Sequence, residues 1–567
     1  MNKFNNQQPI YVKYRYALLL VSFFLVLYIL PLGARDLFVP DETRYGEIPR
    51  EMIAGGDWAV PHLNGLRYFE KPPMGYWVHA GSILLFGENN FAVRLPSAMA
   101  VGLSALLIFV LVSRVYRKKT KEDGFPAILA VLTFLTCFEV FGVGSTAVLD
   151  SLFSFFLTAT LTAFYFASEA PPGSPGERRF LLPAGLSCGL AFLTKGFLAF
   201  AVPVLVLAPY LVWQRRYIDL FRMSWLPILI AALVALPWSI LIHLKEPDFC
   251  RFFFWNEHIR RFMADSAQHK GSFWFFFMAA PGSFMPWTFV IPAAVAGIRQ
   301  LLSDRGLQGP LIRFSICWLV LPFLFFSASN GKLLTYILPC FPPFAILMAF
   351  GLSHALNKGK KKGFQWGVVG TGMLFGLILL ALMYVQFFGY QGFRPYSQPW
   401  KVIMAVNSLV FFILFCFWAF RNQESMKKII LFALSPFLLF FIAHFIIPDL
   451  TIEKKAPGIL LERYSQDIGH DTIIISDEDT VRAVCWYLKR SDVYVLGGGG
   501  ELDYGLAYED AAGRWIDMKS AVGLIKRNQG KILLIAMVKN ILRWRDQLPK
   551  PVFLDDSGPE GYVFWRY

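Results

Sequence analysis

Two stretches near the amino terminus hold an unusual density of charged side chains in an otherwise apolar chain. FVPDETRYGEIPREM covers residues 38–52 and YFEKPPMGYW covers residues 68–77. Their charged residues are Asp41, Glu42, Arg44, Glu47, Arg50, Glu51, Glu70 and Lys71. Carboxylates beside cations can bind a phosphate, hold a divalent metal, orient an acceptor or act as a base. The alternative is a solvated loop with local ion pairs.

Isolated charges also occur at the ends of apolar runs. They are Asp150 in STAVLDSLFSFF, Lys195 in AFLTKGFLAF, and Lys332, close to Tyr336, in SNGKLLTYILPCF. An ionisable group on a membrane helix is costly, so it tends to face a partner or a water-filled cavity. Each lysine alone is equally well explained as an anchor that reaches the membrane surface. The recurrence of such charges favours a shared polar cavity.

A third polar stretch, PDFCRFFFWNEHIRRF, mixes aromatic residues with Arg251, His258, Arg260 and Arg261. This composition suits anionic headgroups or a lipid phosphate, and it suits an aromatic belt with basic flanks equally well. The chain has no phosphate-binding Walker loop, no GxSxG elbow and no HExxH helix. The GGGG run at 497–500 lacks GxGxxG spacing, so we interpret it as a loop.

The composition requires that membrane helices position these residues. Of the 567 residues, 56% are hydrophobic and 16% are charged, and the mean hydropathy is +0.49. Such a chain is too apolar for a soluble globular protein. The thirteen predicted spans are residues 16–33, 92–113, 125–143, 147–168, 180–195, 196–213, 224–243, 273–298, 312–328, 334–355, 366–388, 401–420 and 429–448. The first is a retained helix without a cleavage site.

Residues 449–567 differ from the preceding chain, because charges return and strand-like runs such as TIIIS and KILLIAMV appear. We therefore expect a transmembrane domain over residues 1–448 and a small soluble α/β domain over residues 449–567. Within the first loop, residues 34–91, EIPREMIAGGDW predicts a short amphipathic helix at the membrane interface that ends at Gly55-Gly56.

Loop charges predict the orientation in the membrane. Four short basic loops alternate along the chain: RVYRKKTKE, WQRRYIDLFR, NKGKKKG and RNQESMKK. The positive-inside rule places them in the cytoplasm together with the amino terminus. The opposite face then receives residues 34–91, the turns near 145 and 195, residues 244–272, the turn at 329–333, residues 389–400, and the C-terminal domain. These loops explain the net charge of +15 better than nucleic-acid binding does.

Six segments in order resemble the ArnT family of lipid A 4-amino-4-deoxy-L-arabinose transferases, within the protein-mannosyltransferase-like GT-C superfamily. They are FVPDETRYGEIPREM, YFEKPPMGYW, LDSLFSFF, FLTKGF, EHIRRF and KLLTYILPCF. The resemblance covers essentially the whole chain. It implies a GT-C fold of about thirteen membrane helices in the bacterial inner membrane, with the active site and a C-terminal soluble α/β domain in the periplasm.

The resemblance also implies the reaction and its partners. A sugar, 4-amino-4-deoxy-L-arabinose, would move from undecaprenyl phosphate to a lipid A phosphate with inversion, a lipopolysaccharide modification linked to polymyxin resistance. The implied partners are the lipid-linked donor, the lipid A acceptor and membrane lipids, with no nucleic acid and a monomeric enzyme. Gly46, Pro49 and Leu334 depart from common family residues, which could alter acceptor fit.

The resemblance assigns roles by position. The catalytic residues are Asp41, Glu42 and Asp150. The donor phosphate would contact Arg44, Lys71, Lys195 and Arg260. The substrate cavity would contain Tyr68, Tyr336 and Lys332. Glu70 and His258 would hold a divalent metal, Zn²⁺ or Mg²⁺, whose catalytic need is open.

An acceptor phosphate is already anionic at neutral pH, so the reaction needs no strong base. Asp41 would orient groups or steady the developing positive charge on the sugar, and cations would stabilise the departing phosphate. One alternative keeps the fold but uses another polyprenyl-phosphate sugar, or a protein or glycan hydroxyl that requires Asp41 as a base. A flippase or transporter is the alternative from another class, but it favours mid-membrane charges and inverted repeats.

Overall fold

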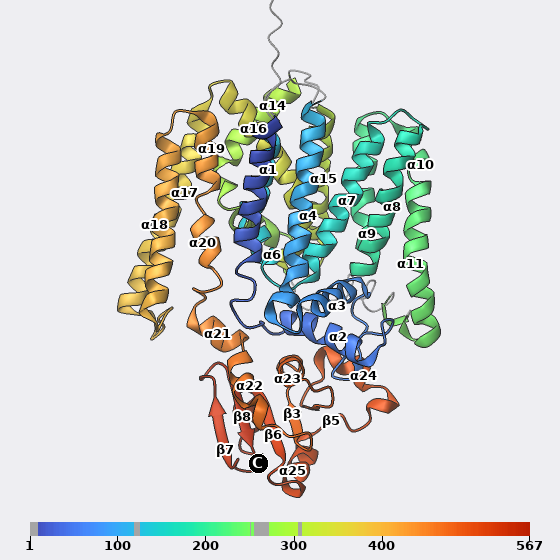
Figure 1. Ribbon diagram of the computed structural model, residues 1–567, viewed down its shortest axis with the longest axis vertical. Coiled ribbons are helices and arrows are strands. Elements are labelled where there is room, and N and C mark those ends of the chain that lie inside the picture. The colour runs from blue at the N-terminus through green and yellow to red at the C-terminus, as the bar shows by residue number, and fades with distance from the viewer. Residues whose placement is uncertain (1–9, 118–124, 250, 254–270, 304–308) are drawn as a thin grey trace, which may run out of the picture.

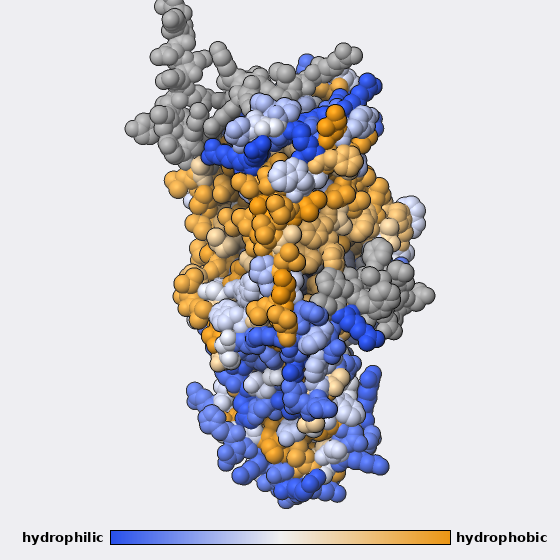
Figure 2. All heavy atoms as spheres, turned by 90° about the vertical axis from the view of Figure 1, so that its right-hand side faces the viewer, coloured by the Kyte–Doolittle hydropathy of each residue, from blue (hydrophilic) through white to orange (hydrophobic). Residues whose placement is uncertain are grey.

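The computed structural model describes residues 10–117, 125–249, 251–253, 271–303 and 309–567. Figure 1 shows a bundle of long helices above a smaller domain of helices and strands, with a short-helix layer between them. A broad hydrophobic band covers the bundle, and hydrophilic residues lie at both ends (Figure 2). This banding is what a chain with a bilayer as solvent requires.

The bundle contains helices of varied length. Its elements are α1 (Ile10–Phe24), η1 (Leu25–Ile29), α4 (Asn90–Arg117), α5 (Phe125–Thr136), α6 (Phe138–Gly144), α7 (Leu149–Ser168), α8 (Pro175–Lys195), α9 (Leu198–Trp213), α10 (Tyr217–Arg222), α11 (Trp225–Lys245), α13 (Phe275–Ser283), η3 (Trp287–Val290), α14 (Ile291–Ser303), α15 (Gly309–Ala328), η4 (Leu334–Cys340), α16 (Phe341–Asn357), α17 (Lys361–Phe388), α18 (Pro399–Arg421), α19 (Ser425–Ala433) and α20 (Phe437–Ile442).

The predicted count of thirteen spans is not confirmed. Within the described residues, eight helices are long and apolar enough to cross a membrane, or ten if two bent pairs each count as one span. The pairs are α5 with α6, bent by 65°, and α13 with α14, bent by 98°. The apolar helices at Ala17–Ile29 and Leu198–Trp213 are shorter than a full span. Helix α8 carries four charged residues, which lower its hydropathy.

The first loop forms a compact layer under the bundle. Its elements are α2 (Asp41–Gly55), β1 (His62–Leu63), β2 (Leu66–Arg67) and α3 (Met74–Phe86). Helix α2 ends where predicted, because Gly56 adopts a left-handed conformation with φ of 70°. It begins earlier than the predicted amphipathic segment, at Asp41, and most of its residues are buried between the bundle and the C-terminal domain. The sequence predicted an amphipathic helix that lies in the membrane interface, whereas α2 is buried within the protein.

The C-terminal domain is built on a mixed six-stranded sheet in the order β5-β4-β3-β6-β8-β7. The predicted runs form β3 (Ile473–Ser476) and β6 (Ile532–Met537). Its other elements are α21 (Asp449–Lys455), α22 (Gly458–Tyr464), η5 (Ser465–Asp467), α23 (Val481–Leu488), β4 (Tyr494–Leu496), η6 (Gly500–Leu502), α24 (Asp503–Leu506), η7 (Glu509–Ala511), β5 (Trp515–Ile516), α25 (Met518–Arg527), α26 (Val538–Trp544), β7 (Phe553–Asp556) and β8 (Tyr562–Arg566). The first three glycines of the GGGG run form a loop after β4, as predicted, and the fourth, Gly500, begins η6.

The C-terminal domain and the first loop share one hydrophobic core. Buried side chains such as Ile48 and Tyr76 belong to the same cluster as Trp486 and Phe564. Helix α23 packs against α2, where Gly46 leaves space for the Trp486 ring. The strands β5, β4, β3 and β6 are parallel, and the elements after β3 and β4 lie beside the first loop (Figure 1).

Candidate functional site

Two distant helix ends meet in a buried ion pair. Lys195 Nζ lies 2.7 Å from Asp150 Oδ1, and both side chains are largely buried. Asp150 lies in the first turn of α7 and Lys195 is the last residue of α8, so each charge complements its helix dipole. The Lys195 ammonium also lies 5.1 Å from the centre of the Tyr336 ring. The structure thus brings together three of the residues that sequence reasoning placed in one cavity.

A second cluster surrounds the Arg44 guanidinium. Arg44 pairs with Asp41 one helical turn away, donates to the Tyr68 hydroxyl at 3.1 Å and pairs with Glu501 of the C-terminal domain at 2.7 Å. Glu501 also pairs with Arg482 at 2.9 Å. Burial raises the pKa of Glu501, but the charges of Arg44 and Arg482 outweigh burial and hold it well below its usual range. The predicted residues Asp41, Arg44 and Tyr68 therefore lie together.

The Tyr45 side chain of α2 lies within electrostatic range of charged groups from both clusters. It is buried, and burial raises its pKa well above the usual range. The charged groups that act on Tyr45 are Arg44, Asp41, Asp150 and Glu501. Leu149, which directly precedes Asp150, belongs to the same buried cluster as Tyr45 and Tyr68, so the two clusters lie in one region at the end of the bundle that faces the C-terminal domain.

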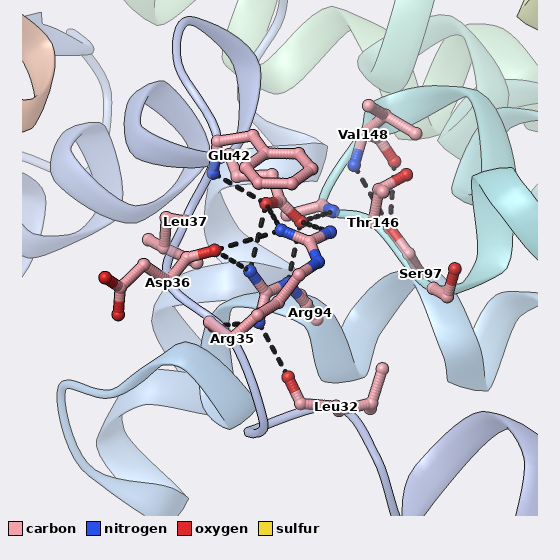
Figure 3. Close-up of polar contacts among 12 residues, drawn as sticks. Leu32, Arg35, Asp36, Leu37, Glu42, Arg94, Ser97, Thr146 and Val148 are labelled. Carbon is pink, nitrogen blue, oxygen red and sulfur yellow. Dashed lines mark hydrogen bonds and ion pairs between the residues drawn. The ribbon is translucent and has the colours of Figure 1, made fainter. Parts of the chain in front are cut away.

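Glu42 lies apart from both clusters in an ion-pair network of its own (Figure 3). Its carboxylate pairs with Arg94 at 2.7 Å and with Arg35 at 2.6 Å, and it accepts the backbone N–H groups of Phe38 and Ala147. Burial raises the pKa of Glu42, but the charges of Arg94 and Arg35 outweigh burial and lower it from 4.5 to about 2. Because two guanidinium groups and two backbone N–H groups donate to it, Glu42 has the geometry of a framework residue, whereas the resemblance implied a catalytic one.

Lys332 also has a different environment from the expected cavity. Its ammonium donates to the backbone carbonyl groups of Phe326 at 2.9 Å, Ser327 at 2.6 Å and Ser329. A lysine ammonium has three donors, so all three are used. These acceptors lie at and just beyond the last turn of α15, so Lys332 caps this helix end. Contact with a substrate would require one of these bonds to break.

The predicted metal and phosphate residues of the basic stretch fall largely outside the structure. His258 and Arg260 lie outside the described residues, as does most of the PDFCRFFFWNEHIRRF segment. The Lys71 ammonium donates to the Glu70 backbone carbonyl at 2.9 Å. Among the residues that the structure describes, no group of three or more His, Cys, Asp or Glu side chains fits a metal. The metal at Glu70 and His258 stays a prediction, and no chemical step is derived through it.

Sequence reasoning missed several charged residues of this region. Glu139 in α6 is buried within electrostatic range of Asp150, and the rule that singled out Asp150 also applies to it, since it interrupts an apolar span. Glu501 follows the GGGG run directly. A loop after a parallel strand is a common place for functional residues, and this rule could have drawn attention to Glu501.

Two family models match separate parts of the chain. Residues 13–253 match the family model of dolichyl-phosphate-mannose-protein mannosyltransferases, and residues 452–565 match that of the arabinosyl transferase ArnT C-terminal domain. A curated protein of Shewanella sediminis, named undecaprenyl phosphate-alpha-4-amino-4-deoxy-L-arabinose arabinosyl transferase, is 40% identical over 98% of both chains. A relative of the same name in Erwinia tasmaniensis is 37% identical over 98% of this chain and 99% of its own.

The fold matches a solved structure along nearly the whole chain. The crystal structure of ArnT from Cupriavidus metallidurans bound to undecaprenyl phosphate superposes with a TM-score of 0.81. The alignment covers 97% of this chain and 98% of that one, at 23% identity. At this identity the likeness establishes the GT-C fold.

Proposed function

This chain belongs to the family of undecaprenyl phosphate-alpha-4-amino-4-deoxy-L-arabinose arabinosyl transferases, and from this premise we propose that it transfers that aminosugar from undecaprenyl phosphate to a lipid A phosphate. The observation that carries the proposal is similarity over 98% of both chains to a relative of that name. The paired charges of Asp150 and Lys195, beside the Arg44 cluster, support a site for a charged lipid-linked substrate.

The proposed reaction is a single displacement at the anomeric carbon. An oxygen of the lipid A phosphate forms the new bond to this carbon from the face opposite the donor. The bond from the carbon to the undecaprenyl phosphate oxygen breaks, and its electron pair leaves with undecaprenyl phosphate. No proton has to be removed from the acceptor, because a phosphate is already anionic at neutral pH. Because the acceptor oxygen attacks from the face opposite the leaving oxygen, the configuration of the anomeric carbon is inverted.

The roles follow from where charge changes during this step. Negative charge grows on the departing phosphate, so cations that face it lower the barrier, and we assign Lys71, Lys195 and Arg260 to it. Asp150 holds Lys195 in place through the 2.7 Å ion pair. Asp41 is the most exposed carboxylate of the Arg44 cluster, and we assign it to the sugar, where positive charge develops. A divalent metal at Glu70 and His258 is an additional proposal.

We further place the reaction on the periplasmic face of the inner membrane. The polar clusters lie at the end of the bundle next to the C-terminal domain, and helix α10, which forms the YIDLFR part of the basic segment WQRRYIDLFR, lies at the opposite end (Figure 1). The positive-inside rule then assigns the clusters to the outer face. Reporter fusions after residue 45 and at the carboxyl terminus test this, and a cytoplasmic signal from either would refute it.

The first prediction concerns Lys71. The variant Lys71→Ala should reach the membrane in normal amount and lose transfer, because it removes a cation from the departing phosphate. Mass spectrometry of lipid A from cells that lack their own enzyme measures the result as a pentosamine-sized increment. The matched control is Lys526→Ala, which removes an exposed lysine from the end of α25.

The outcomes separate the assignments. Lys526→Ala should give wild-type lipid A, and wild-type modification by Lys71→Ala would refute the role of Lys71. Unmodified lipid A in cells with the wild-type gene would refute the acceptor. Asp41→Asn tests the acceptor chemistry further, since it should impair transfer to a phosphate only partly but should abolish transfer to a hydroxyl, which needs a base.

A further inference from the structure

The C-terminal domain turns the carboxyl ends of two parallel strands toward the membrane bundle. Helix α23 follows β3, and the segment of η6 and α24 follows β4. In α/β folds the loops at this end of a sheet usually carry the functional residues. Here the elements that follow these strands pack on the first loop, α23 on α2 and α24 on the β1-β2 hairpin.

The segment after β4 docks closely on the first loop. A Cβ atom added to Gly505 would lie 2.5 Å from the Arg67 carbonyl oxygen, so only glycine permits this approach. The Tyr504 ring lies 5.3 Å from that of Phe69 and 4.2 Å from that of Phe252. Phe69 directly precedes Glu70 and Lys71 in the chain. The segment therefore supports the backbone that carries residues assigned to the reaction.

Glu501 is the point where this segment reaches the polar site. One carboxylate oxygen, Oε2, accepts from three donors: Arg44 at 2.7 Å, Tyr68 at 3.0 Å and Arg482 at 2.9 Å. Arg44 and Tyr68 also bond to each other at 3.1 Å. The result is a closed triangle of Glu501, Arg44 and Tyr68, with Arg482 behind the carboxylate. Charge-assisted bonds of this kind fix direction as well as distance.

The charges of the cluster balance without a substrate. Arg44 and Arg482 carry two positive charges, and Asp41 and Glu501 carry two negative ones. Both terminal nitrogens of Arg44 donate to protein partners, while its buried Nε has no hydrogen-bond partner among the described residues. This geometry is more typical of an arginine that orients neighbouring side chains than of one whose terminal nitrogens are open to a phosphate.

We propose that Glu501 is a positioning residue of the transfer site, through which the C-terminal domain fixes the Arg44 guanidinium and the Tyr68 hydroxyl. The inference rests on the proposed function for the reaction that is assayed, and it assigns to the C-terminal domain a part in that reaction. Glu501 itself touches no substrate. It acts by holding two residues that line the site.

An ion pair that only docks the two parts would look different, and the chain contains one. Lys489 of the C-terminal domain pairs with Glu88 of the first loop at 2.7 Å, with side chains 44% and 41% exposed. Lys489 also lies over the Trp486 ring, 4.0 Å from its centre. This pair joins the same two parts of the chain away from Arg44 and Tyr68. It is therefore the matched control.

The experiment compares Glu501→Gln with Glu88→Gln in the full-length protein, reconstituted with undecaprenyl-phosphate-linked aminoarabinose and lipid A. Glu501→Gln keeps the side-chain shape but removes the charge. Misplacement of a site residue by about 1 Å can cost about 100-fold in rate, so we expect kcat to fall by about 10-fold to 100-fold. The KM for the donor should stay within about 3-fold, because Glu501 does not bind it. Glu88→Gln should keep both constants.

The conservative variant Glu501→Asp distinguishes positioning from bulk stability. It retains the charge, so its kcat should lie between those of wild type and Glu501→Gln, and all three are compared at a temperature at which circular dichroism shows each of them to be folded. A wild-type kcat for folded Glu501→Gln overturns the proposal, and so does an equal loss in Glu88→Gln. If Glu501→Gln does not fold, Glu501→Asp decides, since a wild-type kcat there also overturns it.

Failure of the proposed function gives a different result. In that case the wild-type protein itself transfers no aminoarabinose. The same comparison is then made with the polyprenyl-phosphate sugar that the wild type accepts, and an unchanged kcat of Glu501→Gln on that donor overturns the role of Glu501.

Discussion

Replacement of Glu42 by glutamine tests whether this carboxylate stabilises the fold or takes part in the reaction. The side chain is 3% exposed and lies between Arg94 and Arg35. Glutamine keeps the shape, removes the charge and turns an NH₂ group toward donors that need an acceptor. We expect Glu42→Gln to lower the free energy of unfolding, because two buried guanidinium groups lose the charge that compensates them.

The magnitude follows from two independent arguments. Removing one partner from a buried ion pair typically costs about 3–5 kcal/mol. The pKa of Glu42 is about 2 in the folded protein, against an ordinary value of 4.5. A pKa difference of one unit between the folded and unfolded states corresponds to about 1.4 kcal/mol of stability. The charge of Glu42 therefore contributes about 3 kcal/mol at neutral pH.

The sign of the pH dependence follows from the same values. A carboxyl group with a lowered pKa in the folded state stabilises the protein fully above its unfolded pKa. For Glu42 this contribution is present above pH 4.5 and is lost as the pH falls toward 2. Between these limits the wild type should lose stability more steeply than Glu42→Gln.

The assay is the unfolding free energy of purified protein in mixed micelles, measured by titration with denaturing detergent and followed by tryptophan fluorescence. Glu88→Gln is the control, since its exposed pair with Lys489 should be worth about 1 kcal/mol or less. The reasoning would be refuted if Glu42→Gln unfolded within about 1 kcal/mol of wild type and yet lost turnover. Glu42 would then act on the substrates, as the family resemblance implies.

Two further variants test the other contacts. Asp150→Asn should reach the membrane but lower kcat by about 10-fold or more, because Lys195 loses its 2.7 Å partner and its orientation; a wild-type kcat in proteoliposomes would exclude this role. Gly65→Ala should speed proteolysis of the C-terminal domain, since φ is 70° and the added Cβ would lie 2.7 Å from the Ser491 carbonyl oxygen. Its control is Gly55→Ala, where nothing lies within 4 Å of the added Cβ.

The charges at the ends of apolar spans were the most informative sequence feature. Asp150 and Lys195 stand 45 residues apart, yet the rule that membrane charges need partners predicted their convergence, and the structure pairs them. The same rule predicted that Lys332 lines the substrate cavity, whereas the partners of its ammonium group are backbone carbonyl groups. Burial cost requires a partner, but it does not say whether that partner is a side chain, a helix end or a substrate.

The density of charge in the first loop was less informative. Asp41 and Glu42 are neighbours, but successive helix positions point in directions about 100° apart, so one faces Arg44 and the other faces Arg94. Only the tertiary structure separates their roles. By contrast, the Asn64-Gly65 pair could have predicted the β1-β2 hairpin, since both residues have positive φ in its turn.

The contact between Arg44 and Glu501 lies beyond any sequence rule, because 457 residues separate the partners. The composition change near residue 449 predicts a boundary between lipid and water, but a change of composition does not make an independent folding unit. Ile48 and Trp486 lie in one hydrophobic cluster, and Asn64 bonds to both backbone groups of Val493. Deleting residues 449–567 would expose that core and unpair those groups, so a loss of activity on deletion could not reveal what the C-terminal domain does. Point variants such as Glu501→Gln, which leave the shared core intact, can.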